Sequence, residues 1–404
     1  MITLGTSNAR FAGEFPAEPR TVIRVSRDPG RPAGLRRREG FVVHSTDIPD
    51  GFACYFLIDG VSPADLDPGS RPVVTLPADF SYLGDGDIVR IEPHRGAARV
   101  LFRRSSAMNS FLLTEQCNNY CLMCSQPPRQ VDDGWIVDEI LAALPLIDPD
   151  TPEIMFSGGE PTLLGARFLE LVQACKSFLP RTALHVLSNG RSFADPDFAA
   201  ALGRIGHPDL MVGIPIYSDL ADVHDYVVQA EGAFDETILG VLNLKRFKVP
   251  VEIRVVLHRQ TVDRLPDLAH FITRNLLFVD HVALMGLEWM GFARAHVDLL
   301  WVDPVEYQEQ LAAAVGTLDR ARVNVSIYNS QLCTMDRSLW RFARRSISDW
   351  KQEYVPECEG CQVADQCAGF FASASLRYSA AIAPILDPWW MGPFQIGSPE
   401  RRSR

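Results

Sequence analysis

The chain has 404 residues, of which 47% are hydrophobic and 22% charged, and its formal net charge is −11. This length suits two or three compact units, and the acidic balance argues against nucleic acid as a partner. No apolar run approaches the about 18 residues of a membrane-spanning helix, and the first residues lack the basic-then-apolar layout of a secretory signal. We therefore expect a cytoplasmic protein with no membrane partner, whose nine cysteines are thiols.

Residues 1–105 consist of short β-rich runs separated by Pro, Gly and Asp clusters. Examples are FVVHST (41–46) and FACYFLID (52–59). This pattern predicts a small sheet or barrel. It carries no chemical motif, and Cys54 within it is expected to be a buried, small apolar side chain.

From residue 106 onward, apolar strands alternate with amphipathic helices. Strands are expected at 110–114, 153–157, 183–188, 210–216, 251–257 and 281–287, and the first two helices at 134–147 and 166–179. Cys175 falls on the apolar face of the second helix, which predicts a core residue rather than a ligand. About six βα units in tandem predict a parallel sheet that curves like part of a barrel, with its active site at the carboxyl ends of the strands.

Three cysteines, Cys117, Cys121 and Cys124, follow the first of these strands in TEQCNNYCLMCSQPPRQ (114–130), with the spacing C-x3-C-x2-C. A structural zinc site would need a fourth ligand, and no further Cys or His follows in this loop. Three thiolates can instead hold a four-iron cluster and leave one iron open for a cofactor or substrate.

Two motifs follow the next two strands: FSGGEPTLLG (156–165) and LSNG (187–190). With the cysteine spacing, they resemble the radical S-adenosylmethionine (radical SAM) superfamily. The resemblance implies a partial (β/α)6 barrel that binds a 4Fe–4S cluster through Cys117, Cys121 and Cys124, and SAM at the open iron. It also implies cofactor-binding residues. Gly158, Gly159, Glu160 and Pro161 would offer acceptors to the SAM ammonium. Ser188 and Asn189 would form hydrogen bonds to the ribose, and the backbone of Met123 would contact adenine.

Some superfamily members direct a polar residue at the cofactor from the strand at 251–257, where this chain has Arg254. The alternative for Arg254 is a structural ion pair. No catalytic residue is assigned beyond the cluster and SAM. Candidates for substrate contact, each with a capping or structural role as the alternative, are Tyr217, Ser218, His224, Asp225 and Glu288.

A second cysteine group comprises Cys333, Cys358, Cys361 and Cys367. Four thiolates can close either an iron–sulfur cluster or a zinc site, and the spacing does not choose between them. After such a barrel, the array resembles the extension of SPASM and twitch radical SAM proteins, which implies one auxiliary cluster of the 4Fe–4S type. No cysteine follows Cys367, so we expect a shortened, twitch-like form.

Four parts are therefore expected along the chain. They are a β-rich N-terminal domain (1–105), a radical SAM partial barrel (106–300), a twitch-like auxiliary cluster domain (301–375) and a C-terminal tail (376–404). The fold class is thus α/β, with a small β-rich domain before the barrel and a cysteine-rich iron–sulfur extension after it.

A closer resemblance rests on LLTEQCNNYCLMCSQPPR (112–129), ALMGLEWMGFA (283–293) and CAGFF (367–371). From about residue 80 to residue 372, the chain is similar to the HxsC family of radical SAM maturases from the His-Xaa-Ser peptide system. This implies a ribosomally made peptide substrate with His-Xaa-Ser repeats, modified by hydrogen abstraction. It also implies three partners: a second radical SAM protein, a small accessory protein and an external one-electron donor.

Two other classes of function stay open from the sequence. One is a radical SAM enzyme that acts on a small molecule or a nucleotide. The other is a non-catalytic iron–sulfur or zinc scaffold protein.

Overall fold

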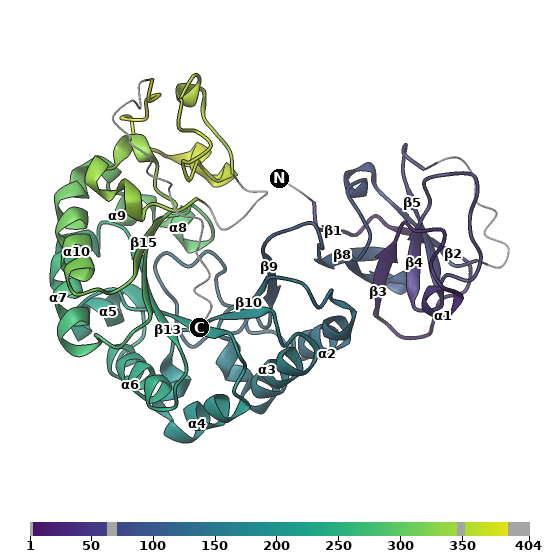
Figure 1. Cartoon of the computed structure of the whole chain (residues 1–404), viewed down its shortest axis with the longest axis horizontal. Helices are drawn as coiled ribbons and strands as arrows, with labels where there is room; N and C mark the ends of the chain where they lie inside the picture. Colours follow the sequence, from purple (N-terminus) through teal and green to yellow (C-terminus); the bar gives the residue numbers. More distant parts are fainter. Residues whose placement is uncertain (1–2, 63–70, 346–351, 387–404) are drawn as a thin grey trace.

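The computed structural model describes residues 3–62, 71–345 and 352–386. Figure 1 shows a β-rich unit at one end of the long axis, a curved sheet with helices outside it, and a C-terminal segment beside the far edge of that sheet. Most of the expected tail, residues 387–404, lies outside the described residues. Among the described residues, no helix is long and apolar enough to cross a membrane.

The N-terminal unit is an eight-stranded mixed sheet in the order β1-β8-β7-β3-β4-β5-β6-β2. The outermost strands, β1 and β2, are joined by residues 7–9, so the sheet curls and its two edges come close together. Its apolar core includes Cys54, which is 1% exposed, and burial raises the pKa of this thiol to about 12. The strands are Gly5–Thr6, Arg10–Ala12, Thr21–Ser26, Glu39–Val42, Cys54–Ile58, Val73–Leu76, Ile88–Glu92 and Ala97–Phe102.

The second sheet has seven strands, all parallel, in the order β15-β14-β13-β12-β11-β10-β9. This confirms the predicted α/β fold with a parallel sheet. The six expected strands are present, and β15 is a seventh that was not predicted from the sequence. In chain order the strands are Asn109–Leu112, Glu153–Ser157, Ala183–Leu187, Leu210–Pro215, Val251–Leu257, His281–Gly286 and Val325–Tyr328.

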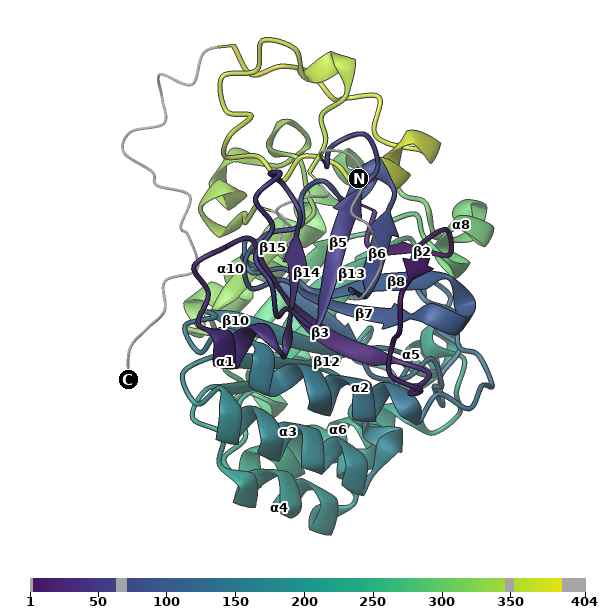
Figure 2. The ribbon, with the colours of Figure 1, turned by 90° about the vertical axis from the view of Figure 1, so that its right-hand side faces the viewer.

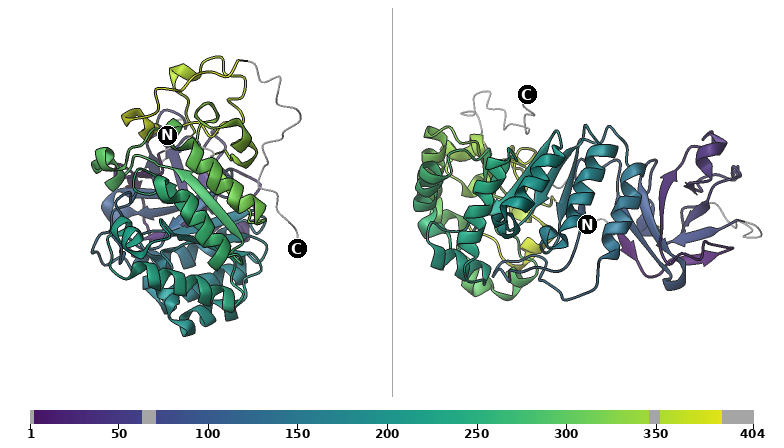
Figure 3. Two further views of the ribbon diagram at one scale, coloured as in Figure 1. Left: turned by 90° about the vertical axis from the view of Figure 1, so that its left-hand side faces the viewer. Right: turned by 90° about the horizontal axis from the view of Figure 1, so that it is seen from below.

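Helices cover the convex side of the parallel sheet, as Figures 2 and 3 show. The helix expected at 134–147 ends earlier, at Ala143, because Pro145 lies in the next turn and cannot continue an α-helix. Cys175 in α3 is 0% exposed and belongs to the core, as predicted. The helices that follow the parallel strands are α2 (Trp135–Ala143), α3 (Ala166–Phe178), α4 (Pro196–Ile205), α5 (Ala221–Val228), α6 (Ala233–Arg246), α7 (Leu265–Asn275), α8 (Phe292–Ala295), α9 (Val297–Leu300) and α10 (Gln308–Arg320).

The two faces of the parallel sheet differ in polarity, and β13 shows this most clearly. Its residues Val251, Ile253 and Val255 are fully buried among the helices of the convex side. The alternate residues Glu252 and Arg254 point to the opposite, concave side, since successive side chains of a strand alternate. The concave side therefore offers polar groups to whatever lies within the curve.

The C-terminal segment, residues 329–345 and 352–386, is built from short 3-10 turns and isolated bridges. It is attached to the last strand by the bridge between Ile327 and Ala343, and it is held internally by a bridge between Glu353 and Phe370. Its turns are Leu332–Thr334, Arg337–Phe342, Pro356–Cys358 and Ala372–Leu376.

A buried cluster of charges fixes the N-terminal sheet to α2. The guanidinium of Arg20 lies 3.7 Å from the centre of the Trp135 ring, and Arg90 approaches the same ring at 5.3 Å. Arg90 also pairs with Glu139 of α2 at 2.9 Å and with Glu92 at 3.0 Å. These ion pairs are mostly buried, so they limit the ways in which the two units can pack.

Candidate functional site

The three-cysteine loop leaves β9 and is closed at its base by Asp133. The carboxylate of Asp133 accepts hydrogen bonds from Thr114 Oγ1 at 2.9 Å and from the backbone N–H of Glu115 at 2.6 Å. The N–H of Arg129 donates to the carbonyl of Glu115 at 2.9 Å. The loop between residues 113 and 134 therefore leaves and re-enters the fold at one point.

The middle of this loop is held by α5 and by the segment after β14. The N–H groups of Tyr120 and Leu122 donate to the last turn of α5, at 3.0 and 2.9 Å. From the segment after β14, Phe292 N–H donates to the carbonyl of Cys124 at 2.8 Å, and the His296 ring nitrogen Nδ1 lies 2.8 Å from the carbonyl of Leu122.

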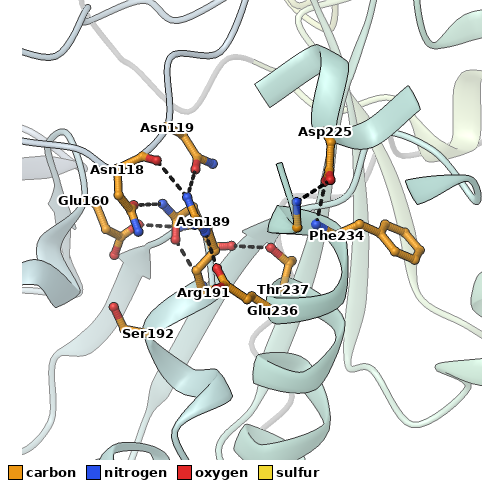
Figure 4. A network of polar contacts seen from close by, with 12 residues as sticks. Asn118, Asn119, Glu160, Asn189, Arg191, Ser192, Asp225, Phe234, Glu236 and Thr237 are labelled. Atoms are coloured by element: carbon orange, nitrogen blue, oxygen red, sulfur yellow. Dashed lines mark hydrogen bonds and ion pairs between the residues drawn. The ribbon is translucent and has the colours of Figure 1, made fainter. Parts of the chain in front are cut away.

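Arg191 provides a third attachment, drawn in Figure 4. Its Nη1 donates to the carbonyl of Asn118 and to the side chain of Asn119, both at 2.7 Å, and its Nε pairs with Glu236 of α6 at 2.5 Å. Asn189 Nδ2 donates to Asn118 Oδ1 at 2.6 Å. The cysteine loop is thus tied to the loop after β11 and, through it, to α6.

The thiols of Cys117, Cys121 and Cys124 are partly buried and close to one another. Burial raises the pKa of all three thiols, to about 11 for Cys117, and the neighbouring cysteines raise those of Cys117 and Cys121 further. Three such thiols give up their protons when cationic iron replaces them. The loop therefore fits an iron–sulfur cluster held by three thiolates.

The glycines of FSGGEP lie against the cysteine loop itself. A Cβ on Gly159 would lie 2.1 Å from the carbonyl oxygen of Gln116, and one on Gly158 would lie 2.5 Å from that of Thr114. In this structure the contact that excludes a side chain at both glycines is with the backbone of residues 114–116. The expected contact of these glycines with SAM stays a prediction.

Glu160 is fully buried, and its carboxylate accepts four hydrogen bonds from the protein. The donors are Thr162 N at 2.9 Å, Thr162 Oγ1 at 2.6 Å, Ser188 Oγ at 2.8 Å and Asn189 N at 2.6 Å. Burial raises the pKa of Glu160, and these hydrogen bonds oppose that rise. These hydrogen bonds hold the loops after β10 and β11 together, and the contact of this carboxylate with the SAM ammonium stays a prediction.

The other expected cofactor residues are brought to the same edge of the sheet. Ser188 and Asn189 follow β11 and are nearly buried, and both donate to protein acceptors. Pro161 is buried in the turn after Glu160. Met123 is 6% exposed and packs in a cluster that includes Tyr217 and Trp289. Their contacts with SAM stay predictions.

Three of the candidates for substrate contact after β12, His224, Ser218 and Asp225, have partners within the protein, and contact of the candidates with substrate stays a prediction. His224 Nδ1 accepts from the N–H of Tyr217 at 3.2 Å, and Ser218 Oγ accepts from the N–H of Leu220 at 3.1 Å. Asp225 accepts from two backbone N–H groups at the start of α6, at 2.6 and 2.8 Å. Tyr217 belongs to the apolar cluster against which Cys121 packs. Burial raises the pKa of Tyr217 well above its usual value, and the thiols of Cys121 and Cys124 raise it further.

A polar network on the concave face was not recognised from the sequence. Glu252 pairs with Arg254 at 2.5 Å and with His281 at 2.6 Å, and the second ring nitrogen of His281 lies 3.0 Å from Ser326 Oγ. Burial alone would raise the pKa of Glu252, but His281 and Arg254 lower it to about 2. The sequence does contain a signal for this network: in VEIR (251–254), the polar residues Glu252 and Arg254 alternate with apolar ones. Arg254 is thus in an ion pair, as its alternative reading stated.

The second cysteine group also comes together. Cys333, Cys358, Cys361 and Cys367 line one small cavity with Tyr354 and Ile385. Burial raises the pKa of Cys333, Cys358 and Cys367, and neighbouring thiols of the group raise it further. The N–H of Ile385 points at the Cys361 sulfur at 3.4 Å. None of the four forms a disulfide.

The fold and the site together define an α/β protein with a parallel sheet and a three-cysteine loop after the first strand of that sheet. The profile of the radical SAM superfamily matches residues 111–272. The matched residues hold Cys117, Cys121, Cys124 and both glycine-containing loops. A domain of this superfamily implies a 4Fe–4S cluster and SAM as its cofactors.

Comparison with characterised proteins gives partial matches. The chain is 25% identical over 164 residues to an Fe-coproporphyrin III synthase from Methanosarcina barkeri (strain Fusaro / DSM 804), and the match covers 39% of this chain and 38% of that one. Among solved structures, Streptococcus suis SuiB bound to S-adenosylmethionine gives a TM-score of 0.45 at 12% identity, covering 63% of this chain and 54% of that chain. Native anSMEcpe with bound AdoMet and Cp18Cys peptide gives 0.47 at 14%, covering 69% and 91%.

Replacing Arg191 with Met should loosen the cysteine loop, because it removes the guanidinium bonds to Asn118 and Asn119. Hydrogen bonds to charged groups contribute about 1.5–3 kcal/mol each. We expect an iron chelator to remove iron about tenfold faster from the variant, as measured by absorbance of the chelate. Glu236→Gln is the matched control, since it leaves the bonds from Arg191 to the loop in place. An Arg191→Met protein that loses iron at the parent rate would show that the other attachments suffice.

Replacing Glu160 with Ala should destabilise the fold, because it leaves buried donors without an acceptor. Unsatisfied buried groups cost about 1–3 kcal/mol each, so the free energy of unfolding should fall by about 3 kcal/mol or more in anaerobic denaturant titrations. Thr162→Val removes only one side-chain donor and should cost less. If Glu160→Ala keeps the parent stability and loses only SAM affinity, the carboxylate contacts SAM directly.

Proposed function

We propose that this protein is a radical SAM enzyme that cleaves S-adenosylmethionine reductively and modifies a ribosomally made peptide of the His-Xaa-Ser type by hydrogen abstraction. The observation that carries the proposal is the gathering of Cys117, Cys121 and Cys124 in one loop, held directly against the loops of FSGGEP and LSNG. All three segments follow the carboxyl ends of adjacent strands, β9, β10 and β11.

The residues of this chain would divide the work as follows. The three thiolates would hold the 4Fe–4S cluster, and the backbone after β10 and β11 would bind SAM through its ammonium and ribose. The bound cluster supplies the electron that splits SAM into methionine and a 5'-deoxyadenosyl radical. Glu160 and Arg191 would keep the three loops in register, so that the hydrogen to be abstracted lies within reach. The concave face would shield the site from water.

The second cysteine group is proposed to hold an auxiliary cluster of the 4Fe–4S type in a twitch-like unit. Four thiols around one cavity support it. A zinc ion held by the same four thiolates is the alternative.

The peptide substrate and its system are supported by the resemblance of the cysteine loop and the segment 283–293 to His-Xaa-Ser maturases. On this proposal, the partners are the repeat-containing peptide, a second radical SAM protein, a small accessory protein and a one-electron donor, all in the cytoplasm. A small-molecule substrate is the second candidate, because the curated relative is named for an iron porphyrin. That relationship spans only 38% of the relative's length.

Replacing Cys121 with Ala should abolish SAM cleavage, because two thiolates do not hold a cluster with one open iron. The measurement is 5'-deoxyadenosine formed under strong reductant by anaerobically reconstituted protein. Cys175→Ala is the matched control: this thiol lies in the core at 0% exposure, and its loss should leave iron content and cleavage unchanged.

Three outcomes would decide against the proposal. Undiminished 5'-deoxyadenosine from Cys121→Ala would end the radical SAM assignment of this loop. A parent protein that binds iron or zinc yet forms no 5'-deoxyadenosine would be a scaffold. Cleavage that is coupled to an iron porphyrin, with no mass change in a co-expressed His-Xaa-Ser peptide, would establish the small-molecule alternative.

Replacing Cys361 with Ala should remove one cluster and leave the other. We expect iron to fall by roughly four atoms per chain, and uncoupled SAM cleavage to survive while modified peptide disappears. Circular dichroism must show an intact fold, because the described part of the C-terminal segment also packs against the barrel. A folded variant that has lost this iron and still modifies peptide at the parent rate would show that the auxiliary cluster has no part in turnover.

A further inference from the structure

A pocket lies at the carboxyl ends of β13, β14 and β15, beneath the C-terminal segment. Leu257, Gly286 and Asn329 bound it on the barrel side, where the three strands end, and Phe370 and Tyr378 bound it from the segment above. The pocket therefore exists only where the barrel and the C-terminal segment meet.

This pocket is adjacent to both cysteine groups. Gln331, Gly369 and Phe370 line it and also line the cavity of Cys333, Cys358, Cys361 and Cys367. On the other side, its wall is the loop after β14, which reaches the first cysteine group. There Phe292 N–H donates to the carbonyl of Cys124 at 2.8 Å, and a Cβ on Gly291 would lie 2.4 Å from that oxygen. A ligand in the pocket would be one loop away from each group.

Two pairs of aromatic rings form the walls. Trp289 and Trp301 of the barrel lie 5.8 Å apart between ring centres, and Phe370 and Tyr378 of the C-terminal segment lie 5.6 Å apart. Arg377 joins the two sides: its carbonyl accepts from Trp289 Nε1 at 2.8 Å, and its guanidinium stacks 4.8 Å from the Trp301 ring. Aromatic walls favour a planar ring as occupant.

The charge of the pocket limits the chemistry of its ligand. Among the described residues that line it, Glu288 and Arg377 are the charged ones, and the polar remainder are neutral amides and hydroxyls such as Asn329, Gln331 and Ser379. A ligand with several carboxylates would meet a single guanidinium, which leaves most of its charge unpaired. An amide backbone with an uncharged ring finds partners for both parts.

We propose that this pocket binds the substrate peptide by a planar ring side chain, such as imidazole or phenyl, which it holds between the two cysteine groups. The proposal rests on the proposed function for the identity of the ligand as a peptide. It adds the part of the peptide that is recognised and the residues that recognise it. Trp301 and Tyr378 line the pocket and are only partly buried, so their rings would contact the ring of the peptide.

The test uses the full chain with its clusters reconstituted and its tryptophans replaced by 5-fluorotryptophan. Fluorine NMR signals of Trp289 and Trp301 are assigned by Trp→Phe substitution, and blocked tripeptides acetyl-Gly-X-Ser-amide are titrated with X as His, Phe or Ala. The His or Phe peptide should shift these two signals saturably, with an affinity about tenfold above that of the Ala peptide.

Two variants make the result specific to the pocket. Tyr378→Ala should weaken binding of the ring peptides by about tenfold. Phe178→Ala is the matched control, because this ring is 49% exposed at the end of α3, and it should change nothing. Equal affinity for the Ala peptide, shifts confined to other tryptophans, or displacement of the ring peptide by Fe-coproporphyrin III would overturn the proposal.

This experiment separates the pocket from the chemistry, since no reductant is added. Ring peptides that bind as expected to a protein that releases no 5'-deoxyadenosine would overturn the proposed function and keep the pocket. Normal reductive cleavage of SAM, together with equal binding of the ring peptides and the Ala peptide, would overturn the pocket proposal and keep the proposed function.

Discussion

The buried carboxylate of Glu160 is the interaction on which the arrangement of the site depends. A carboxylate without exposure to water needs donors on both oxygens, and here they come from its own turn and from the loop after β11. The same loop then holds Asn118 through Asn189. Three loops that would otherwise move separately are therefore fixed relative to one another, and the thiols are fixed with them.

The parallel sheet supports this arrangement because its two faces differ. Helices pack on an apolar convex face, whereas the concave face keeps ion pairs such as Glu252 with Arg254. The side chains of this pair are mostly buried, so each charge is met by a protein partner rather than by water. The N-terminal sheet adds to the rigidity, because Arg20 stacks on Trp135 at the start of α2, directly after the cysteine loop.

Local patterns of sequence determined much of the fold and the content of the site. Alternation of apolar strands and amphipathic helices predicts the parallel sheet, because burial on one side repeats with the period of each element. The same reasoning placed Cys175 in the core. Spacing within one loop brought Cys117, Cys121 and Cys124 together as candidates, since residues so close in the chain cannot be far apart in space.

Contacts between distant parts of the chain were decided only by the tertiary structure. Arg191 reaches the carbonyl of Asn118 across 73 positions, and no local pattern encodes that bond. The donors that Glu160 meets from the loop after β11, Ser188 and Asn189, are likewise 28 and 29 positions away in the chain. The glycines before it fit the backbone of residues 114–116. Which partner a polar side chain satisfies depends on what folding places beside it, and the sequence names only the groups that compete for it.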